Sequence, residues 1–141
     1  MLEHLRFPNK LFKEIHRILR PGGTTLMLTP NVLYYPYAAN RLLSNLLKQE
    51  MRMKLVERIT EMRSEDIFPV SYGCNTPGKV TRELESAGLQ ITLLTTCCDC
   101  LVSAYNRPLG LAAIGYERLV SVLHINGVKG LIVAEAKKNP M

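Results

Sequence analysis

The chain has 141 residues, and 18 Lys and Arg residues against 12 Asp and Glu residues give it a net charge of +6. Its hydrophobic content of 47% is too high for a disordered chain, and its length is that of one domain. The longest uncharged stretch, residues 21–40, contains three prolines, which exclude a membrane-spanning helix because each removes a backbone donor. Glu3 and Arg6 interrupt the opening apolar residues, so no signal peptide is recognisable. We therefore expect one globular unit, cytoplasmic and without a membrane span.

The positive charge is concentrated in the first part of the chain. Residues 1–63 hold 11 Lys and Arg residues against 5 Asp and Glu residues, so they carry the whole excess. Much of it lies between Arg41 and Arg63, and a basic helix of this kind can bind nucleic acid or an anionic membrane surface. Acidic residues are interleaved there, with Glu50 four residues before Lys54, and this spacing favours an exposed helix with ion pairs. We favour the exposed helix, with nucleic-acid binding as the weaker alternative.

The cysteines do not have the spacing of a metal site. They are Cys74, Cys97, Cys98 and Cys100. Zinc ligands usually come in two separated pairs, and neither a second Cys pair nor a His pair completes such a set here. The segment 91–102 is rich in Thr, Leu and Val and is typical of a buried strand, in which Cys packs as a small apolar side chain. We predict no metal site and no disulfide scaffold.

Hydrophobic periodicity predicts alternating helices and strands. The clearest helix spans residues 9–19, with Asn9 as its N-cap and the segment 20–23 (RPGG) as its stop. Residues 31–36 read as a loop that introduces a group of tyrosines. Further helices are expected at residues 38–63, 77–87 and 108–123, and strands at 24–29, 89–98 and 130–136. This alternation predicts an α/β layered fold.

The three histidines differ as candidate functional residues. His16 lies beside Arg17 on the first helix, and His124 lies in an apolar run that favours packing. His4 precedes the first helix, where a strand-to-helix loop is expected, and ligands of open α/β sheets bind in such loops. The sequence contains neither a glycine-rich phosphate loop nor a recognisable nucleophile motif. His4 is therefore the best candidate from position alone.

Three sequence blocks together resemble the class I S-adenosylmethionine-dependent methyltransferases. They occur in the family's order and spacing: Leu2-Glu3-His4-Leu5, then Leu19-Arg20-Pro21-Gly22-Gly23 after an amphipathic helix, then Leu28-Thr29-Pro30-Asn31. In that family these blocks mark the end of the fourth strand, the end of the next helix and the end of the fifth strand. Residues 66–88 are similar to the helix before the sixth strand, and residues 130–136 would be the antiparallel seventh strand.

The resemblance implies an α/β fold that is the C-terminal part of a Rossmann-like seven-stranded sheet, with strands 5, 6 and antiparallel 7 and flanking helices. The whole chain, residues 1–141, would be one partial domain. Residues 1–37 would hold the end of strand four, a helix, strand five and a loop. Residues 38–75 would be a helical lid region, and residues 76–141 a helix, strand six, a helix and strand seven.

The resemblance also implies a cofactor, S-adenosylmethionine, and residues close to it. Glu3, His4 and Leu5 match the family positions nearest the cofactor's methyl group, and His4 could act as general base towards a hydroxyl acceptor. In some related O-methyltransferases an E-x-x-E-H motif holds a divalent metal, but its first Glu would fall before Met1, so no metal site is expected. The family's glycine-rich cofactor loop and acidic ribose-binding residue do not occur in the 141 residues. We therefore expect a truncated enzyme, inactive alone, that needs the missing half to use the cofactor.

On the acceptor side, the resemblance implies Pro30 and Asn31, followed by Tyr34 and Tyr35 in a variable substrate lid. Packing under the long helix is an equal alternative for the tyrosines. The implied reaction is methyl transfer to a small-molecule acceptor. The alternative is a non-catalytic remnant or accessory domain that keeps the fold and binds no cofactor alone.

The implied missing strand has a physical consequence. Without a fourth strand, the fifth strand at residues 24–29 would be a bare sheet edge that is apolar on both faces. Such an edge pairs readily with another chain. We therefore expect self-association through the exposed edge.

Overall fold

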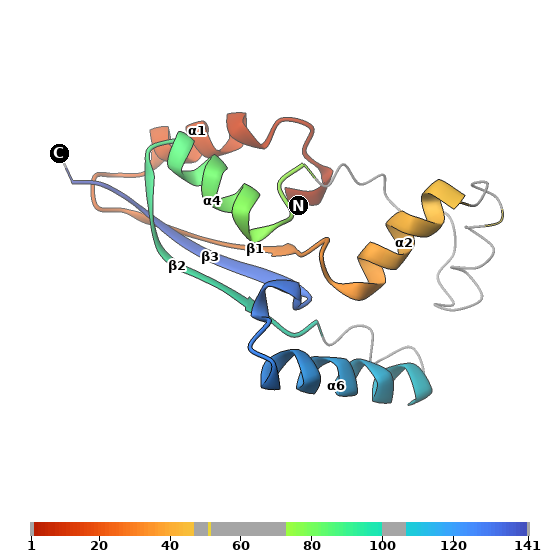
Figure 1. Ribbon diagram of the computed structural model, residues 1–141. Coiled ribbons are helices and arrows are strands. Elements are labelled where there is room, and N and C mark those ends of the chain that lie inside the picture. The colour runs from red at the N-terminus through yellow and green to blue at the C-terminus, as the bar shows by residue number, and fades with distance from the viewer. Residues whose placement is uncertain (1, 47–50, 52–72, 100–106, 141) are drawn as a thin grey trace.

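The computed structural model describes residues 2–46, 51, 73–99 and 107–140, which form a mixed α/β structure around a three-stranded sheet (Figure 1). The elements in chain order are η1 (Leu2–His4), α1 (Pro8–Ile18), β1 (Thr24–Pro30), α2 (Tyr35–Leu46), α4 (Pro77–Ser86), β2 (Leu89–Cys97), α6 (Arg107–Val122), η3 (Asn126–Val128) and β3 (Leu131–Lys138). The α/β class and the three predicted strands are confirmed, each strand to within two residues at either end.

The last strand of the chain is the central strand of the sheet. The strand order is β1-β3-β2, and β3 runs antiparallel to both neighbours. It follows that β1 and β2 run parallel to each other and end at the same edge of the sheet. The expectation of an antiparallel last strand is therefore confirmed. In the described part of the chain β1 pairs only with β3, so β1 is an edge strand.

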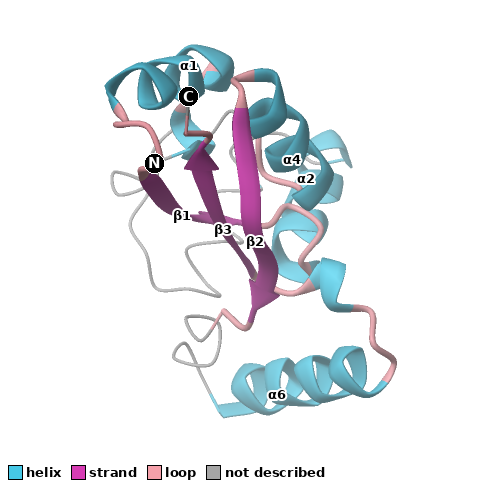
Figure 2. Ribbon diagram, turned by 90° about the vertical axis from the view of Figure 1, so that its left-hand side faces the viewer, coloured by secondary structure: helices cyan, strands magenta, loops and turns pink. Residues whose placement is uncertain are grey.

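One face of the sheet carries the hydrophobic core. Helices α1 and α4 lie together over this face (Figures 1 and 2). Phe12 of α1 and Leu84 of α4 are fully buried against Ile132 of β3. The small residues Ala134 and Ala136 alternate with more exposed neighbours along β3, as expected for a strand with one covered face. Most of the apolar stripe predicted for the first helix belongs to the core (Leu11, Phe12, Ile15 and Leu19), but Ile18, which the prediction also included, is 63% exposed.

The opposite face of the sheet is largely uncovered in the described residues. Leu26 and Leu28 of β1 are 71% and 59% exposed, and Leu93 of β2 is 44% exposed. Leu26 and Leu93 both pair with Glu135 of β3, so these side chains lie on one face. No described helix packs there, and α6 lies beyond the end of the strands instead (Figure 2). The edge strand β1 is thus apolar on this face at Leu26 and Leu28, but three of its residues 24–29 are threonines, so the prediction that both faces are apolar is only partly right.

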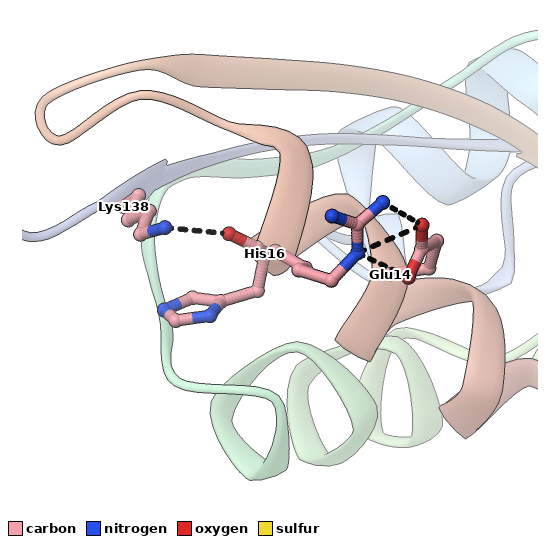
Figure 3. A network of polar contacts seen from close by, with 4 residues as sticks. Glu14, His16 and Lys138 are labelled. Carbon is pink, nitrogen blue, oxygen red and sulfur yellow. Dashed lines mark hydrogen bonds and ion pairs between the residues drawn. The ribbon is translucent and has the colours of Figure 1, made fainter.

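Lys138, at the end of β3, links the sheet to the end of α1 through hydrogen bonds (Figure 3). Its ammonium group donates to the backbone oxygens of His16, at 2.8 Å, and Leu19, at 3.0 Å. The last carbonyls of a helix have no partner within the helix, and a lysine at this end also complements the helix dipole. Glu14 and Arg17, on the same helix, form an exposed ion pair in which Arg17 lowers the pKa of the Glu14 carboxyl through a hydrogen bond.

Two predicted helix starts are displaced. Helix α1 begins at Pro8 with Phe7 as its N-cap, so the prediction of Asn9 as the cap is wrong. Helix α2 begins at Tyr35, so Tyr35 and Tyr37 lie on its first turn rather than in a loop. Both differences have one cause: proline is well tolerated in the first helical turn, where its missing N–H has no partner to lose. Each of the two helices therefore includes a proline in its first turn that the prediction had placed before the helix.

The prediction that the cysteine segment is a buried strand is only partly right. Strand β2 ends at Cys97, and the next residue, Cys98, is exposed. Strand β2 also contains a bulge between Ile91 and Leu93, where the pairing register with β3 shifts. Strand β2 is not buried throughout because one face of the sheet is uncovered, so only the residues that point to the other face can be buried. Cys100 lies outside the described residues.

The first residues and the long basic helix are described only in part. Leu2–His4 form a 3-10 helix, and Met1, where the fourth strand would end, lies outside the described residues. The predicted helix at residues 38–63 is described up to Leu46 as part of α2, and most of the basic stretch up to Arg63 lies outside. Among the helices that the structure describes, none is both long and apolar enough to cross a membrane.

Thr76 provides a test of local stability. Its hydroxyl oxygen accepts a hydrogen bond from the backbone N–H of Lys79, which makes it the N-cap of α4. We expect Thr76→Ala to lower the free energy of unfolding by about 1 kcal/mol, because an N–H of the first turn loses its partner. Urea denaturation measures this change. The control is Thr95→Ala, an exposed threonine, for which we expect a change of less than about 0.5 kcal/mol. Equal effects of the two substitutions would contradict the capping role.

Candidate functional site

The carboxyl ends of β1 and β2 meet at one edge of the sheet. Pro30, the last residue of β1, and Cys97, the last residue of β2, both pair with Leu131, the first residue of β3. The segments that follow β1 and β2 therefore leave the sheet side by side, and α2 and α6 both lie at this end (Figure 1). Ligands of α/β sheets bind outside the carboxyl ends of parallel strands. This edge is the candidate functional site.

Asn31, a predicted acceptor-side residue, has a structural role in this site: its hydrogen bonds join two loops, and we call it a structural tie for this reason. Its side chain is fully buried, and its amide nitrogen donates to the backbone oxygens of Gly127 and Lys129, both at 2.8 Å. Its amide oxygen accepts from the backbone N–H of Leu33 at 3.1 Å. Its backbone N–H donates to Gly130. Asn31 therefore binds the turn before β3 to the loop after β1, and its side chain has little capacity left for a substrate.

Asn75 joins the segment before α4 to the end of β1. Its amide nitrogen donates to the Thr29 hydroxyl at 2.7 Å and to the backbone oxygen of Pro30 at 3.1 Å, and its backbone oxygen accepts from Val32. Asn75 is fully buried, and among the described residues its side-chain oxygen has no hydrogen-bond partner. Pro30, predicted on the acceptor side, is therefore held by its backbone. The sequence reasoning missed Asn75, although an Asn before a Thr-Pro helix start was a visible signal.

Four tyrosines gather at this edge, and we call them the tyrosine cluster: Tyr34, Tyr35, Tyr37 and Tyr116. The ring centres of Tyr34 lie 4.9 Å from Tyr35, 6.1 Å from Tyr37 and 5.7 Å from Tyr116, and those of Tyr35 and Tyr116 lie 4.7 Å apart. The tilted and edge-on arrangements are those that aromatic rings favour. The structure thus brings together the predicted Tyr34 and Tyr35 with Tyr116 of α6, which the sequence did not indicate.

Two acidic side chains border the tyrosine cluster. The Tyr37 hydroxyl donates to the Asp99 carboxylate at 3.3 Å, and Asp99 is only 6% exposed. Glu117, next to Tyr116 on α6, accepts from the Cys98 thiol at 3.2 Å through one oxygen. A Cβ atom at Gly130 would overlap Asp99, so the glycine is needed for Asp99 to pack here. The segment after β2 and helix α6 therefore place two carboxyl groups beside the rings.

The environment of the cluster raises the pKa of its most buried phenol. Burial raises the pKa of Tyr34 well above its usual range, and the nearby Tyr35, Glu117 and Asp99 raise it further. Burial also raises the pKa of Tyr116, with Glu117 contributing. Both phenols are therefore held in the neutral form, as hydrogen-bonding groups rather than as proton acceptors.

The three residues predicted nearest the cofactor lie on η1 or directly after it. His4 is exposed, whereas Leu5 is half-buried and packs against the core. The side chain of Glu3 lies outside the described part. Element η1 contacts β1, and a Cβ atom at Gly73, two residues before Asn75, would lie 3.3 Å from the Leu5 backbone oxygen. The start of the chain thus lies near the loop that Asn75 ties to the end of β1, although no described contact joins His4 to the tyrosine cluster.

The other histidines and Cys74 make no described contact with the tyrosine cluster. His124, predicted to pack, is exposed and has a left-handed backbone with φ of 57°, so that prediction is wrong. His16 is half-buried beside Gly88. Burial raises the pKa of the fully buried Cys74 thiol to about 11, which makes it a poor nucleophile. Within residues 2–46, 51, 73–99 and 107–140, no group of three or more His, Cys, Asp or Glu side chains could hold a metal ion.

The site therefore consists of a rigid frame, formed by Asn31 and Asn75, and of a tyrosine cluster with two carboxyl groups. Comparison with protein-family models gives no match for this chain, and comparison with curated proteins gives no match either.

Proposed function

We propose that the chain is part of an S-adenosylmethionine-dependent methyltransferase that acts on a small-molecule acceptor. The observation that carries the proposal is the ordered set of three motif blocks at residues 2–5, 19–23 and 28–31. The described sheet agrees with it in two respects. Strands β1 and β2 are parallel, and the last strand, β3, is antiparallel to both. The third block also lies at the carboxyl end of β1, where α/β folds bind ligands.

The described residues would give the cofactor little of its binding site. His4 is exposed and offers a polar side chain, whereas Leu5 packs in the core and offers its backbone. When bound, the cofactor supplies a methyl group on a sulfonium that is already activated for direct displacement. Most of its contacts would have to come from a glycine-rich loop that these 141 residues do not contain.

This chain would contribute mainly positioning and exclusion of water. Asn31 and Asn75 fix the loops at the carboxyl edge, so an acceptor bound there would be held in a constant orientation. The buried ring of Tyr34 and the half-buried rings beside it would exclude water from one side of the site. The imidazole of His4 would accept the proton from a hydroxyl acceptor as the bond to the methyl group forms.

The role of His4 is tested in a chain extended by the polypeptide encoded in frame upstream of Met1. We expect His4→Asn to lower the rate of methyl transfer by about a hundredfold or more, because the general base is lost. The matched control is His124→Asn, which replaces another exposed histidine at a backbone conformation that Asn tolerates. A His4→Asn enzyme with the rate of the control would contradict the proposed base.

The second candidate function is a non-catalytic domain that keeps the fold and binds no cofactor alone. The lack of a glycine-rich loop in the 141 residues favours it for the isolated chain. Calorimetric titration of both the isolated and the extended chain with S-adenosylmethionine separates the candidates. Saturable heat would favour a cofactor-binding enzyme, and its absence from both the isolated and the extended chain would favour the non-catalytic domain.

A further inference from the structure

Helix α6 lies beyond the ends of the strands and leaves large apolar side chains in solvent (Figure 2). Four of them are between 47% and 72% exposed: Leu111, Ile114, Leu119 and Val122. Its described buried side chains are the smaller ones of Ala113 and Val120. Packing of an apolar face supplies most of the stability of a helix, and two internal glycines weaken this 16-residue helix further. Helix α6 is therefore held more weakly than α1 and α4, which bury Phe12 and Leu84 in the core.

The described ring and side-chain polar contacts between α6 and the carboxyl edge come from Tyr116 and its neighbour Glu117. The ring of Tyr116 packs against the ring of Tyr34, with 5.7 Å between the ring centres. The Tyr116 hydroxyl donates to the backbone oxygen of Val128, in η3, at 3.1 Å. Glu117 accepts a hydrogen bond from the Cys98 thiol at 3.2 Å. A single turn of α6 thus attaches the helix to the candidate functional site.

The segment that follows α6 contains a fixed part and a hinge. The fixed part is η3, because Asn31 donates to the backbone oxygens of Gly127 and Lys129. Between Val122, the last residue of α6, and η3 lies His124, which has a left-handed backbone with φ of 57°. Residues other than glycine rarely adopt this conformation, and hinges are a few residues at the ends of elements that absorb a change in backbone angles. A rotation at His124 therefore moves α6 while η3 and β3 stay in place.

We propose that α6 is a gate over the carboxyl edge, which opens at His124 when the contacts of Tyr116 break and which thereby exposes Tyr34. In the closed form that the structure shows, Tyr34 is fully buried among the rings of its neighbours. Opening breaks only the contacts of α6, whereas global unfolding breaks the whole core, so opening has the smaller free energy. Such a gate controls when a ligand reaches a site. The motion does not depend on methyl transfer, and if the proposed function holds, α6 admits the acceptor.

Hydrogen exchange of the backbone amides tests the gate on the full chain, in urea concentrations below the unfolding transition. Once α6 leaves the edge it is an isolated helix of marginal stability, so its amides exchange from the open form. We expect the amides of α6 to exchange at least about a hundredfold faster than those of β3, after correction for intrinsic rates, and with a smaller dependence on urea. Equal protection and equal urea dependence of α6 and β3 would overturn the proposal.

The variant Tyr116→Phe tests whether the contacts of Tyr116 hold the gate closed. It keeps the ring and removes the hydrogen bond to Val128. Loss of this bond destabilises the closed form, so we expect the amides of both α6 and β3 to exchange about fivefold faster. Nitration of Tyr34 by tetranitromethane, which modifies accessible phenols, should accelerate by the same factor, because the same opening exposes Tyr34.

The matched control is Tyr37→Phe, which removes a hydroxyl that donates to Asp99 and not to α6 or η3. Its bond persists when the gate opens, so we expect faster exchange in β3 but unchanged exchange in α6 and unchanged nitration of Tyr34. If Tyr116→Phe gave this control pattern, its contacts would not hold the gate. Faster exchange of α6 without faster nitration of Tyr34 would also overturn the proposal, since α6 would then open without uncovering the site. Neither readout involves a methyl donor, so failure here leaves the proposed methyl transfer to be judged by its own test.

Discussion

Replacing Asn31 by alanine is expected to lower the free energy of unfolding by about 3 kcal/mol. The substitution removes three hydrogen bonds, two from the amide nitrogen to Gly127 and Lys129 and one from Leu33 to the amide oxygen. Each bond of this kind contributes about 1 kcal/mol, and the loss is larger where a partner stays buried and unpaired. The side chain is fully buried, so water cannot replace it in the unrelaxed structure. Urea denaturation followed by circular dichroism measures the change.

Two further variants make the Asn31 test specific. Asn31→Asp keeps the acceptor for Leu33 but places an anionic oxygen against two carbonyls, so we expect a loss at least as large as for alanine. The matched control is Asn9→Ala, because Asn9 is exposed and, in the described part of the chain, its side chain accepts a hydrogen bond only from the adjacent Lys10 backbone N–H. We expect it to change stability by less than about 0.5 kcal/mol. If Asn31→Ala were as mild as this control, Asn31 would be free to serve a substrate and would not be a structural tie.

The second large effect is expected for self-association through β1. The strand is an edge of the described sheet, carries no charge, and exposes Leu26 and Leu28. Charged side chains are the usual protection of such an edge. We expect the chain to self-associate, and Leu26→Lys with Leu28→Lys to weaken the association by about a hundredfold or more. Burial of each leucine contributes about 2 kcal/mol, and the added charges repel in any symmetric contact.

Sedimentation over a range of protein concentrations measures this association. The matched control is the double variant Leu111→Lys and Leu119→Lys, which alters two exposed leucines of α6, a helix that lies beyond the ends of the strands (Figure 2). We expect the control to associate as the unmodified chain does. A monomeric unmodified chain that unfolds cooperatively would contradict the prediction, and so would an equal effect of the two double variants.

The order of elements could be predicted because it depends on local patterns. The apolar stripe that includes Phe12 predicts α1, and the short apolar runs predict all three strands. The starts of α1 and α2 were predicted less well. Pro8 and Pro36 were expected to lie outside the helices, and both lie in a first helical turn. The antiparallel direction of β3 came from the family resemblance. Its place between β1 and β2 was not predicted, because strand order depends on contacts between distant segments.

The sequence could predict only those residues of the candidate site that lie close together in one segment of the chain. One segment supplies the predicted residues at the carboxyl edge: Pro30 ends β1, and Asn31, Tyr34 and Tyr35 follow it. Tyr116 and Glu117 join them from α6, more than 80 positions along the chain, and no local pattern indicates that encounter. The hydrogen bonds of Asn31 to Gly127 and Lys129 are equally remote, so its structural role was not visible in the sequence.

The central claim is that this chain forms part of an S-adenosylmethionine-dependent methyltransferase. Its most direct test is calorimetric titration of S-adenosylmethionine into the chain extended by the polypeptide encoded in frame upstream of Met1, after cooperative unfolding has shown that the extended chain is folded. We predict saturable binding with one cofactor per chain. A folded extended chain that gives no binding heat at several temperatures would contradict the claim, as would a stop codon directly upstream together with no binding to the isolated chain.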